Sequence, residues 1–198
     1  MKIVTDQQIT DAAMELILEK GYSETTTVEI AQRAGVNETT LFRRLGSKKE
    51  IVLKALQGNR WVPYLDTAIF ENPEWDLEID LARFMKAYYK RVTTDNVILS
   101  IRLRSPKLFE ETASYIMKVP NSFMDALTGY FAAMQQMGKI PVGDPYSFAM
   151  TVFSATLGFV FLQASFGTEL STISQEEYID TSVKMFANGL NSLTSPDS

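Results

Sequence analysis

The sequence predicts an all-α protein, in which an N-terminal three-helix unit precedes a longer helical domain. Apolar side chains recur three and four positions apart along most of the chain, the spacing of one helix face. No segment alternates as a strand does, and no internal repeat is present. Four short polar residues are each followed three positions later by Glu or Gln, the pattern of a capping box: Thr5, Thr26, Ser47 and Ser174. We expect one functional domain over residues 1–50 and a second over residues 51–198.

Residues 26–50 carry the pattern of two short helices joined by a tight turn. Ala31 is small, which lets a second helix approach the first closely. Gly35 stands where the chain must reverse, and glycine accepts a positive φ without strain. Asn37 can cap the second helix, which turns Leu41 inward. This is the anatomy of a helix-turn-helix, whose second helix enters the DNA major groove.

The outward face of the second helix carries side chains that can hydrogen-bond DNA. Arginine pairs bidentately with guanine, and threonine offers a hydroxyl and a methyl group. Two lysines that open the following helix oppose its dipole unless a phosphate binds there. The residues expected to contact DNA are Thr26, Thr27, Asn37, Glu38, Thr39, Thr40, Phe42, Arg43, Arg44, Lys48 and Lys49. The alternative is a helical hairpin with arginines on a solvated face that binds no DNA.

Over roughly residues 5–57 the chain resembles the DNA-binding domain of the TetR family of transcriptional repressors. The matching residues are Gly21-Tyr22, Thr27-Val28, Ile30-Ala31, Ala34-Gly35-Val36, Thr40-Leu41-Phe42 and Ser47-Lys48-Lys49-Glu50. The family usually has Tyr at Phe42 and often His at Arg44. Phe42 lacks the hydroxyl that would bond a phosphate, so Arg44 either supplies that contact or shifts which bases are read. The resemblance implies a dimer that a small effector releases from DNA.

Charge is distributed unevenly along the chain, although the net charge is −5. Residues 1–60 hold nine Lys or Arg and eight Asp or Glu, a net charge of +1. Residues 61–198 hold ten and sixteen, a net charge of −6. Because DNA responds to the local field of one face, this imbalance permits binding, with an affinity that is modest and sensitive to salt.

The residue types present argue against an enzyme. The chain has no cysteine and no histidine, which removes thiolate and imidazole metal ligands and the usual general base at neutral pH. It has no phosphate-binding P-loop, no dinucleotide-binding glycine motif and no zinc-protease motif. We therefore expect no catalytic site, no metal and no cofactor. The first residues lack the apolar run of a signal peptide, so we expect a cytoplasmic protein.

The 23 residues from Pro145 to Gly167 include no charged side chain. That length could span a bilayer, but scattered Ser and Thr and acidic flanks without Lys or Arg favour a helix buried on all sides. Such a helix packs on its own core and on a second subunit, so we expect a homodimer without membrane contact. In the TetR family the last two long helices dimerise in this way. The expected interface residues are Phe148, Val152, Ala155, Phe159, Ile179, Val183, Phe186 and Leu190.

Aromatic residues and methionines of the second domain suit an apolar, adaptable pocket for a small-molecule effector. The expected lining residues are Trp61, Phe84, Tyr88, Met117, Phe123, Met124 and Phe131. The alternative for each of them is a core residue at helical spacing. The favoured interpretation is a repressor that binds a near-palindromic double-stranded operator as a homodimer and is released by an apolar or amphipathic effector. An interaction protein of this fold without DNA binding and an activator of the same architecture remain open.

Overall fold

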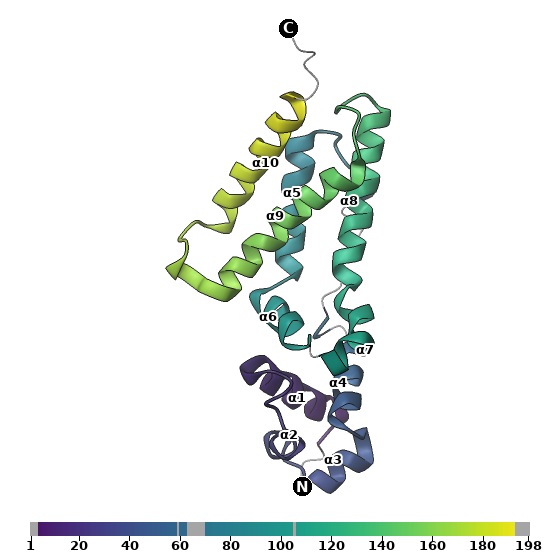
Figure 1. Cartoon of the computed structure of the whole chain (residues 1–198), viewed down its shortest axis with the longest axis vertical. Helices are drawn as coiled ribbons and strands as arrows, with labels where there is room; N and C mark the ends of the chain where they lie inside the picture. Colours follow the sequence, from purple (N-terminus) through teal and green to yellow (C-terminus); the bar gives the residue numbers. More distant parts are fainter. Residues whose placement is uncertain (1–3, 59, 63–69, 105, 193–198) are drawn as a thin grey trace. The chain divides into compact units, whose positions relative to one another are not determined.

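The computed structural model describes residues 4–58, 60–62, 70–104 and 106–192. Throughout these ranges the secondary structure is helical and no strand occurs, which confirms the predicted class (Figure 1). The chain divides into two compact units. The first comprises Met1–Pro63 with Asp95–Lys118, and the second comprises Tyr64–Thr94 with Val119–Ser198.

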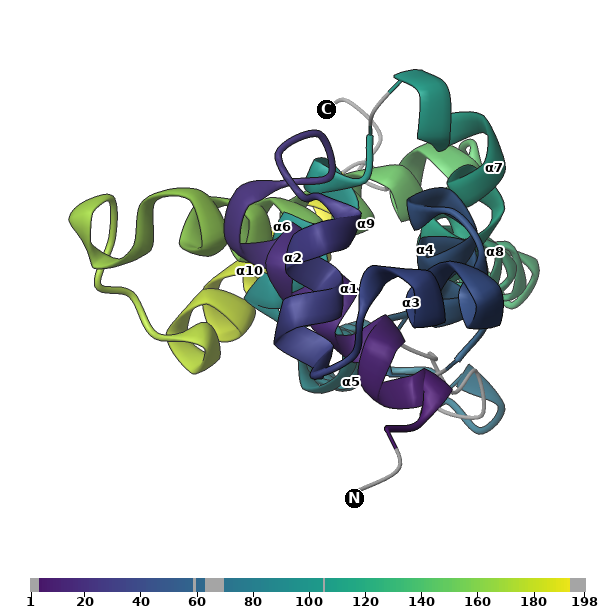
Figure 2. The ribbon, with the colours of Figure 1, turned by 90° about the horizontal axis from the view of Figure 1, so that it is seen from below.

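The helices of the first unit are α1 (Asp6–Lys20), α2 (Thr27–Ala34), α3 (Glu38–Leu45), α4 (Lys48–Gln57), α6 (Thr94–Arg102) and α7 (Pro106–Ile116). Helix α1 is the centre of this unit because its two apolar faces join two clusters. Ile9 and Ala13 pack with buried residues of α2 and α3. Met14 and Ile17 pack instead with buried residues of α4, α6 and α7. Helices α2 and α3 are neighbours in both views (Figures 1 and 2).

Side-chain caps set where the helices of the first unit begin. The capping boxes predicted at Thr5, Thr26 and Ser47 are all present, each closed by the Glu or Gln three residues later. Asn37 caps α3, as expected from its sequence. Since each cap satisfies backbone N–H groups that have no partner in the first turn, these side chains stabilise the start of each helix.

The second unit consists of α5 (Leu77–Arg91), α8 (Lys118–Gln136), α9 (Pro145–Phe166), the 3₁₀ turn η2 (Gly167–Glu169) and α10 (Gln175–Ser192). Asp76 caps α5, Asp144 caps α9 ahead of Pro145, and Ser174 caps α10. Helix α5 packs against α9 and along α10 (Figure 1). The functional boundary expected between residues 50 and 51 falls within α4, and as a division of roles it stays a prediction.

Candidate nucleic-acid interface

The turn between α2 and α3 is closed by backbone hydrogen bonds. Gly35 has φ 73°, in the left-handed region where a side chain would be strained. Beyond it, the N–H of Val36 donates to the carbonyl of Ala31 at 3.0 Å. The Asn37 side-chain oxygen then accepts from the N–H of Thr40 at 2.7 Å. These bonds set the direction in which α3 leaves the turn.

Helix α3 turns one face into the core and the other to solvent. Leu41 is fully buried and Leu45 is 7% exposed, so both anchor the helix. Thr39, Phe42 and Arg43 lie on the exposed side. Phe42 is 49% exposed, and an aromatic ring in that position can contact a thymine methyl group. Arg43 makes no hydrogen bond or ion pair with any residue that the structure describes, so its guanidinium is available to DNA.

Arg44 has a different environment from Arg43. Its Nε and Nη2 donate to Oδ1 of Asp6 at 2.8 and 2.5 Å, and its Nη1 donates to the carbonyl of Val4 at 2.6 Å. Lys54 donates to the other carboxylate oxygen of Asp6 at 2.8 Å. The pKa of Asp6 is lowered, chiefly by the hydrogen bond from Lys54 and then by Arg44, so the carboxylate stays charged. Arg44 thus ties α3 to the start of α1, and contact with DNA would require this pair to open.

The two lysines at the start of α4 also have partners within the first unit. Nζ of Lys48 donates to the carbonyls of Tyr22 and Thr25 at 2.7 and 2.6 Å and lies 4.2 Å from the centre of the Tyr22 ring. Nζ of Lys49 donates to Glu111 of α7 at 2.9 Å. In this structure these ammonium groups hold α4 against its neighbours, and their contact with phosphate stays a prediction.

Of the remaining residues expected to contact DNA, some form hydrogen bonds within the unit and others are accessible on its surface. Thr26 caps α2, and Oγ1 of Thr27 donates to Glu38 at 2.5 Å, which links α2 to α3. The side chains of α3 that remain accessible form one strip, which we call the α3 strip: Thr39, Phe42 and Arg43, which are exposed, and Thr40, which is half-buried. Threonine, phenylalanine and arginine all have known contacts with base edges in the major groove.

Glu29 is expected to make the stability of this unit depend on pH in the acidic range. Its pKa is lowered to about 2, first by the hydrogen bond from Lys20 and then by Thr26, from an ordinary value of 4.5. A lowered carboxyl pKa stabilises the fold above the ordinary value, and that contribution disappears as the pH falls from about 4.5 to about 2. We expect Glu29→Gln, which keeps the capping box, to flatten the fall of the melting temperature in this window. Glu24→Gln, at an exposed glutamate in the preceding turn, should keep the wild-type slope, and equal slopes in all three proteins would contradict the assignment.

The sequence matches the family described as bacterial regulatory proteins, tetR family, over residues 9–55. It also matches the C-terminal domain of AefR-like transcriptional repressors over residues 80–189. The chain belongs to the TetR family of transcriptional regulators. It is 30% identical over 190 residues to the HTH-type transcriptional regulator YvkB of Bacillus subtilis strain 168, covering 94% of this chain and 97% of that protein.

Two solved structures illustrate the shared TetR-family fold. FadR of Bacillus subtilis in complex with stearoyl-CoA has a TM-score of 0.65 and 20% identity, covering 93% of this chain and 99% of FadR. AibR in complex with isovaleryl coenzyme A and operator DNA has a TM-score of 0.65 and 21% identity, covering 91% of this chain and 96% of AibR. Membership of the TetR family makes this chain a DNA-binding transcriptional regulator, with α2 and α3 as its helix-turn-helix.

Most of the aromatic residues expected to line an effector pocket of this TetR-family protein lie in the core of the second unit. Phe84, Phe123 and Phe131 are fully buried, and Tyr88 is 1% exposed. The ring centres of Tyr88 and Phe123 are 5.0 Å apart, and those of Phe84 and Tyr130 are 5.1 Å apart. These edge-to-face contacts are typical of a packed interior, so the alternative of core residues accounts for their environment. Their binding of an effector stays a prediction.

The other expected lining residues are more dispersed. Met124 is buried in the second unit with 7% exposure. Trp61 and Met117 belong to the first unit. Nε1 of Trp61 donates to Asp11 at 2.9 Å, and Met117 is 37% exposed. The structure therefore divides the seven residues between two units, a separation that helical spacing alone does not reveal.

The expected interface residues lie mainly on the inner side of α9 and α10. Val152, Ile179 and Val183 are 2%, 2% and 3% exposed, so within one protomer they are core residues. Phe148 packs on Phe131, and Phe159 packs on Tyr89 and Tyr178. Ala155, Phe186 and Leu190 are half-buried. Contact of these eight residues with a second subunit stays a prediction.

The opposite face of α9 is exposed and combines large apolar side chains with small polar ones. Its residues, which we call the α9 strip, are Met150, Ser154, Phe161, Leu162 and Ser165. Phe161 and Leu162 are 42% and 43% exposed, and Met185 of α10 is 70% exposed. By length and composition alone Pro145–Glu169 could cross a membrane, which is weak evidence for a span, and 28% of its apolar window is buried inside the unit. Exposed apolar side chains of this kind often mark a surface that contacts another protein.

Proposed function

We propose that this chain is a repressor that binds a near-palindromic operator as a homodimer and is released by a small apolar or amphipathic effector. The observation that carries the proposal is the α3 strip, in which Thr39, Phe42 and Arg43 are exposed on a helix held by its cap and by the Arg44–Asp6 pair. Two copies that place α3 about 34–36 Å apart would match successive major grooves. Such a protein acts in the cytoplasm, where its operator is.

The homodimer is proposed to form through the α9 strip together with the exposed face of α10. An isologous interface brings the same surface of both copies together, so apolar residues meet apolar residues. Two helices from each subunit then make a four-helix arrangement. The small side chains of Ser154 and Ser165 within the strip would let the two α9 helices approach closely.

The effector is proposed to act by shifting a population of conformations. A molecule that binds better to a dimer whose α3 helices do not match the grooves lowers the population able to bind the operator. Its effect is limited by its differential affinity for the two states. Acyl compounds are the first class to examine, since stearoyl-CoA and isovaleryl coenzyme A are bound in FadR and AibR. Loss of operator binding on their addition would be read by fluorescence anisotropy.

Arg43→Ala is the mutation that tests the DNA-binding half of the proposal. An operator selected from a random DNA pool provides the ligand, and its position relative to the promoter distinguishes a repressor from an activator. We expect Arg43→Ala to reduce the preference for the selected operator by about 1–3 kcal/mol, roughly 5- to 150-fold, because it removes a contact to a base edge. The melting temperature should not change, since Arg43 has no partner among the described residues.

Two further variants make this test selective. Arg91→Ala removes an exposed cation of the second unit and should leave operator affinity unchanged. Arg44→Ala should lower both the melting temperature and the affinity, because it breaks the pair with Asp6 that orients α3. If Arg43→Ala binds the operator as the wild type does, or if binding shows no salt dependence, the alternative of an interaction protein without DNA binding is favoured.

A further inference from the structure

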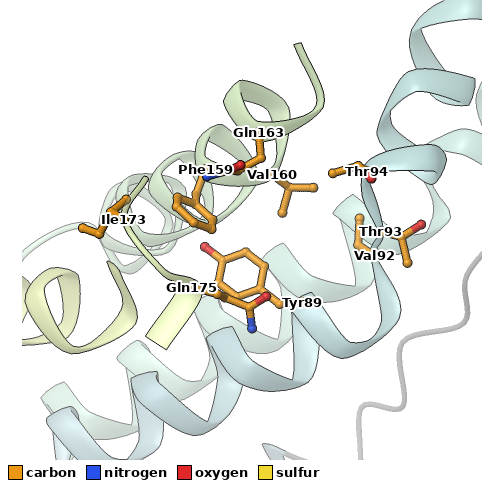
Figure 3. A pocket seen from close by; sticks show the side chains of 9 residues that line it. All are labelled: Tyr89, Val92, Thr93, Thr94, Phe159, Val160, Gln163, Ile173 and Gln175. Carbon is orange, nitrogen blue, oxygen red and sulfur yellow. The ribbon is translucent and has the colours of Figure 1, made fainter. Parts of the chain in front are cut away.

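A pocket of about 350 Å³ opens in the second unit where the end of α5 meets α9 and the start of α10 (Figure 3). This volume is at the lower end of the range of about 300–1,000 Å³ for small-molecule sites. Its lining residues are Tyr89, Val92, Thr93, Thr94, Phe159, Val160, Gln163, Ile173 and Gln175. Phe159, Val160 and Gln163 lie on the face of α9 opposite the α9 strip, so dimerisation through that strip would leave the pocket accessible.

The lining residues select for an uncharged molecule. None of the nine carries a charge, while five have neutral hydrogen-bonding groups: two threonines, two glutamines and Tyr89. Val92, Val160 and Ile173 supply apolar surface, and Phe159 supplies an aromatic ring. A carboxylate or phosphate bound here would lose water without gaining a cation, which disfavours anions such as a whole coenzyme A thioester.

The Tyr89 hydroxyl supplies the specific feature of this pocket. Tyr89 is 7% exposed, and its hydroxyl oxygen is buried without a hydrogen-bond partner among the described residues. Figure 3 shows the ring beside Gln175, with its oxygen pointing toward Phe159. Burial raises the pKa of this hydroxyl, so it remains protonated and can donate. A buried donor without an acceptor destabilises the protein until an acceptor reaches it.

We propose that this pocket binds a neutral amphipathic molecule whose carbonyl oxygen accepts the Tyr89 hydroxyl and whose hydrocarbon part lies along Val92, Val160 and Ile173. An acyl amide or ester has this chemistry. Val92 to Thr94 are the last residues of this segment of the second unit, and Thr94 is also the first residue of α6, whose remaining residues belong to the first unit. A ligand here therefore contacts the segment that continues into the DNA-binding unit, and its action as the effector rests on the proposed function.

The test uses N-methyloctanamide as the neutral probe and octanoate as its charged counterpart, with binding to the full-length protein followed by calorimetry. We expect one saturable site per protomer for the amide and binding at least about tenfold weaker for octanoate. Tyr89→Phe should weaken binding of the amide by about 2- to 10-fold, the effect of one hydrogen bond. The same variant should melt at a higher temperature without the probe, because it removes the unpaired hydroxyl. A residue with only a structural role would not show these opposite changes.

Two other variants complete the experiment. Gln163→Trp fills the pocket from the half-buried side of α9 and should abolish saturable binding of the amide. Tyr146→Phe removes the hydroxyl of a tyrosine that is 53% exposed and outside the pocket, and should bind like the wild type. The proposal is overturned if the amide does not bind, or if Tyr89→Phe binds it as tightly as the wild type does. A thermal gain without any binding would mean that the pocket is only a packing defect.

A titration of the selected operator, without the probe, separates this proposal from the proposed function. A protein that binds the operator but not the amide retains its role as a regulator and loses this site. A protein that binds the amide through Tyr89 but has no affinity for any selected operator retains the site and loses the proposed function.

Discussion

Replacing Phe161 and Leu162 together with glutamate is expected to give a folded monomer that no longer binds the operator at concentrations where the wild type does. Both side chains are more than 40% exposed in the protomer, so the substitutions disturb little of its core. In a symmetric interface each glutamate would be buried near its counterpart or in apolar surroundings, where an unpaired charge is disfavoured. Because a palindromic operator engages two α3 helices at once, loss of the dimer should weaken binding by about 10²- to 10⁴-fold.

Sedimentation equilibrium measures the oligomeric state, and operator titration measures the consequence. The matched control is Ile79→Glu with Val142→Glu, which makes the same change in charge at two apolar residues that are 47% and 95% exposed and lie outside α9. The control should remain dimeric and bind the operator. A double variant at Phe161 and Leu162 that stays dimeric would show that the α9 strip is not the interface.

Local signals explain why the first unit could be predicted from sequence in such detail. Each cap joins residues three positions apart, so the starts of α2 and α3 can be predicted from Thr26 and Asn37 and the residues next to them. Gly35 marks the turn for the same reason, since its positive φ is a local requirement. Arg44 shows the limit of this reasoning. Its partner Asp6 lies 38 positions earlier, and no sequence pattern links a surface arginine to a distant carboxylate.

The second unit is harder to predict because α9, its longest helix, lacks contrast between its faces. Helix α9 is apolar all round, so periodicity indicates that it is covered but not which side faces the core. The expected interface residues such as Val152 are therefore buried in the protomer, while Phe161 and Leu162 are exposed. The aromatic residues raise the same problem. Phe123 is a residue type that suits either an apolar pocket or a core, and in the structure it is a fully buried core residue. The specific role of Tyr89 depends on its unpaired hydroxyl, which sequence does not reveal.

A buried carboxylate should control the stability of the second unit. Asp80 is fully buried and accepts from the N–H of Glu74 and of Trp75, from Arg83 and from the hydroxyl of Tyr130, at 3.0, 2.9, 3.2 and 3.0 Å. Trp75 has φ 59°, a left-handed conformation that a bulky residue keeps only when its surroundings hold it. Its ring stacks on Tyr130 with centres 5.9 Å apart. Asp80 thus fixes the loop before α5 to the start of α5 and to α8.

Asp80→Ala is accordingly expected to destabilise the protein by at least about 2 kcal/mol, because four donors lose their acceptor and the loss for Tyr130 and Trp75 alone is about 1–3 kcal/mol each. Asp76→Ala makes the same exchange four residues earlier, at the exposed N-cap of α5, and should cost only about 1 kcal/mol. Urea unfolding of both variants at one fixed protomer concentration measures the difference, since dimerisation makes stability depend on concentration. Equal losses in the two variants would show that the Asp80 network contributes no more than an ordinary helix cap.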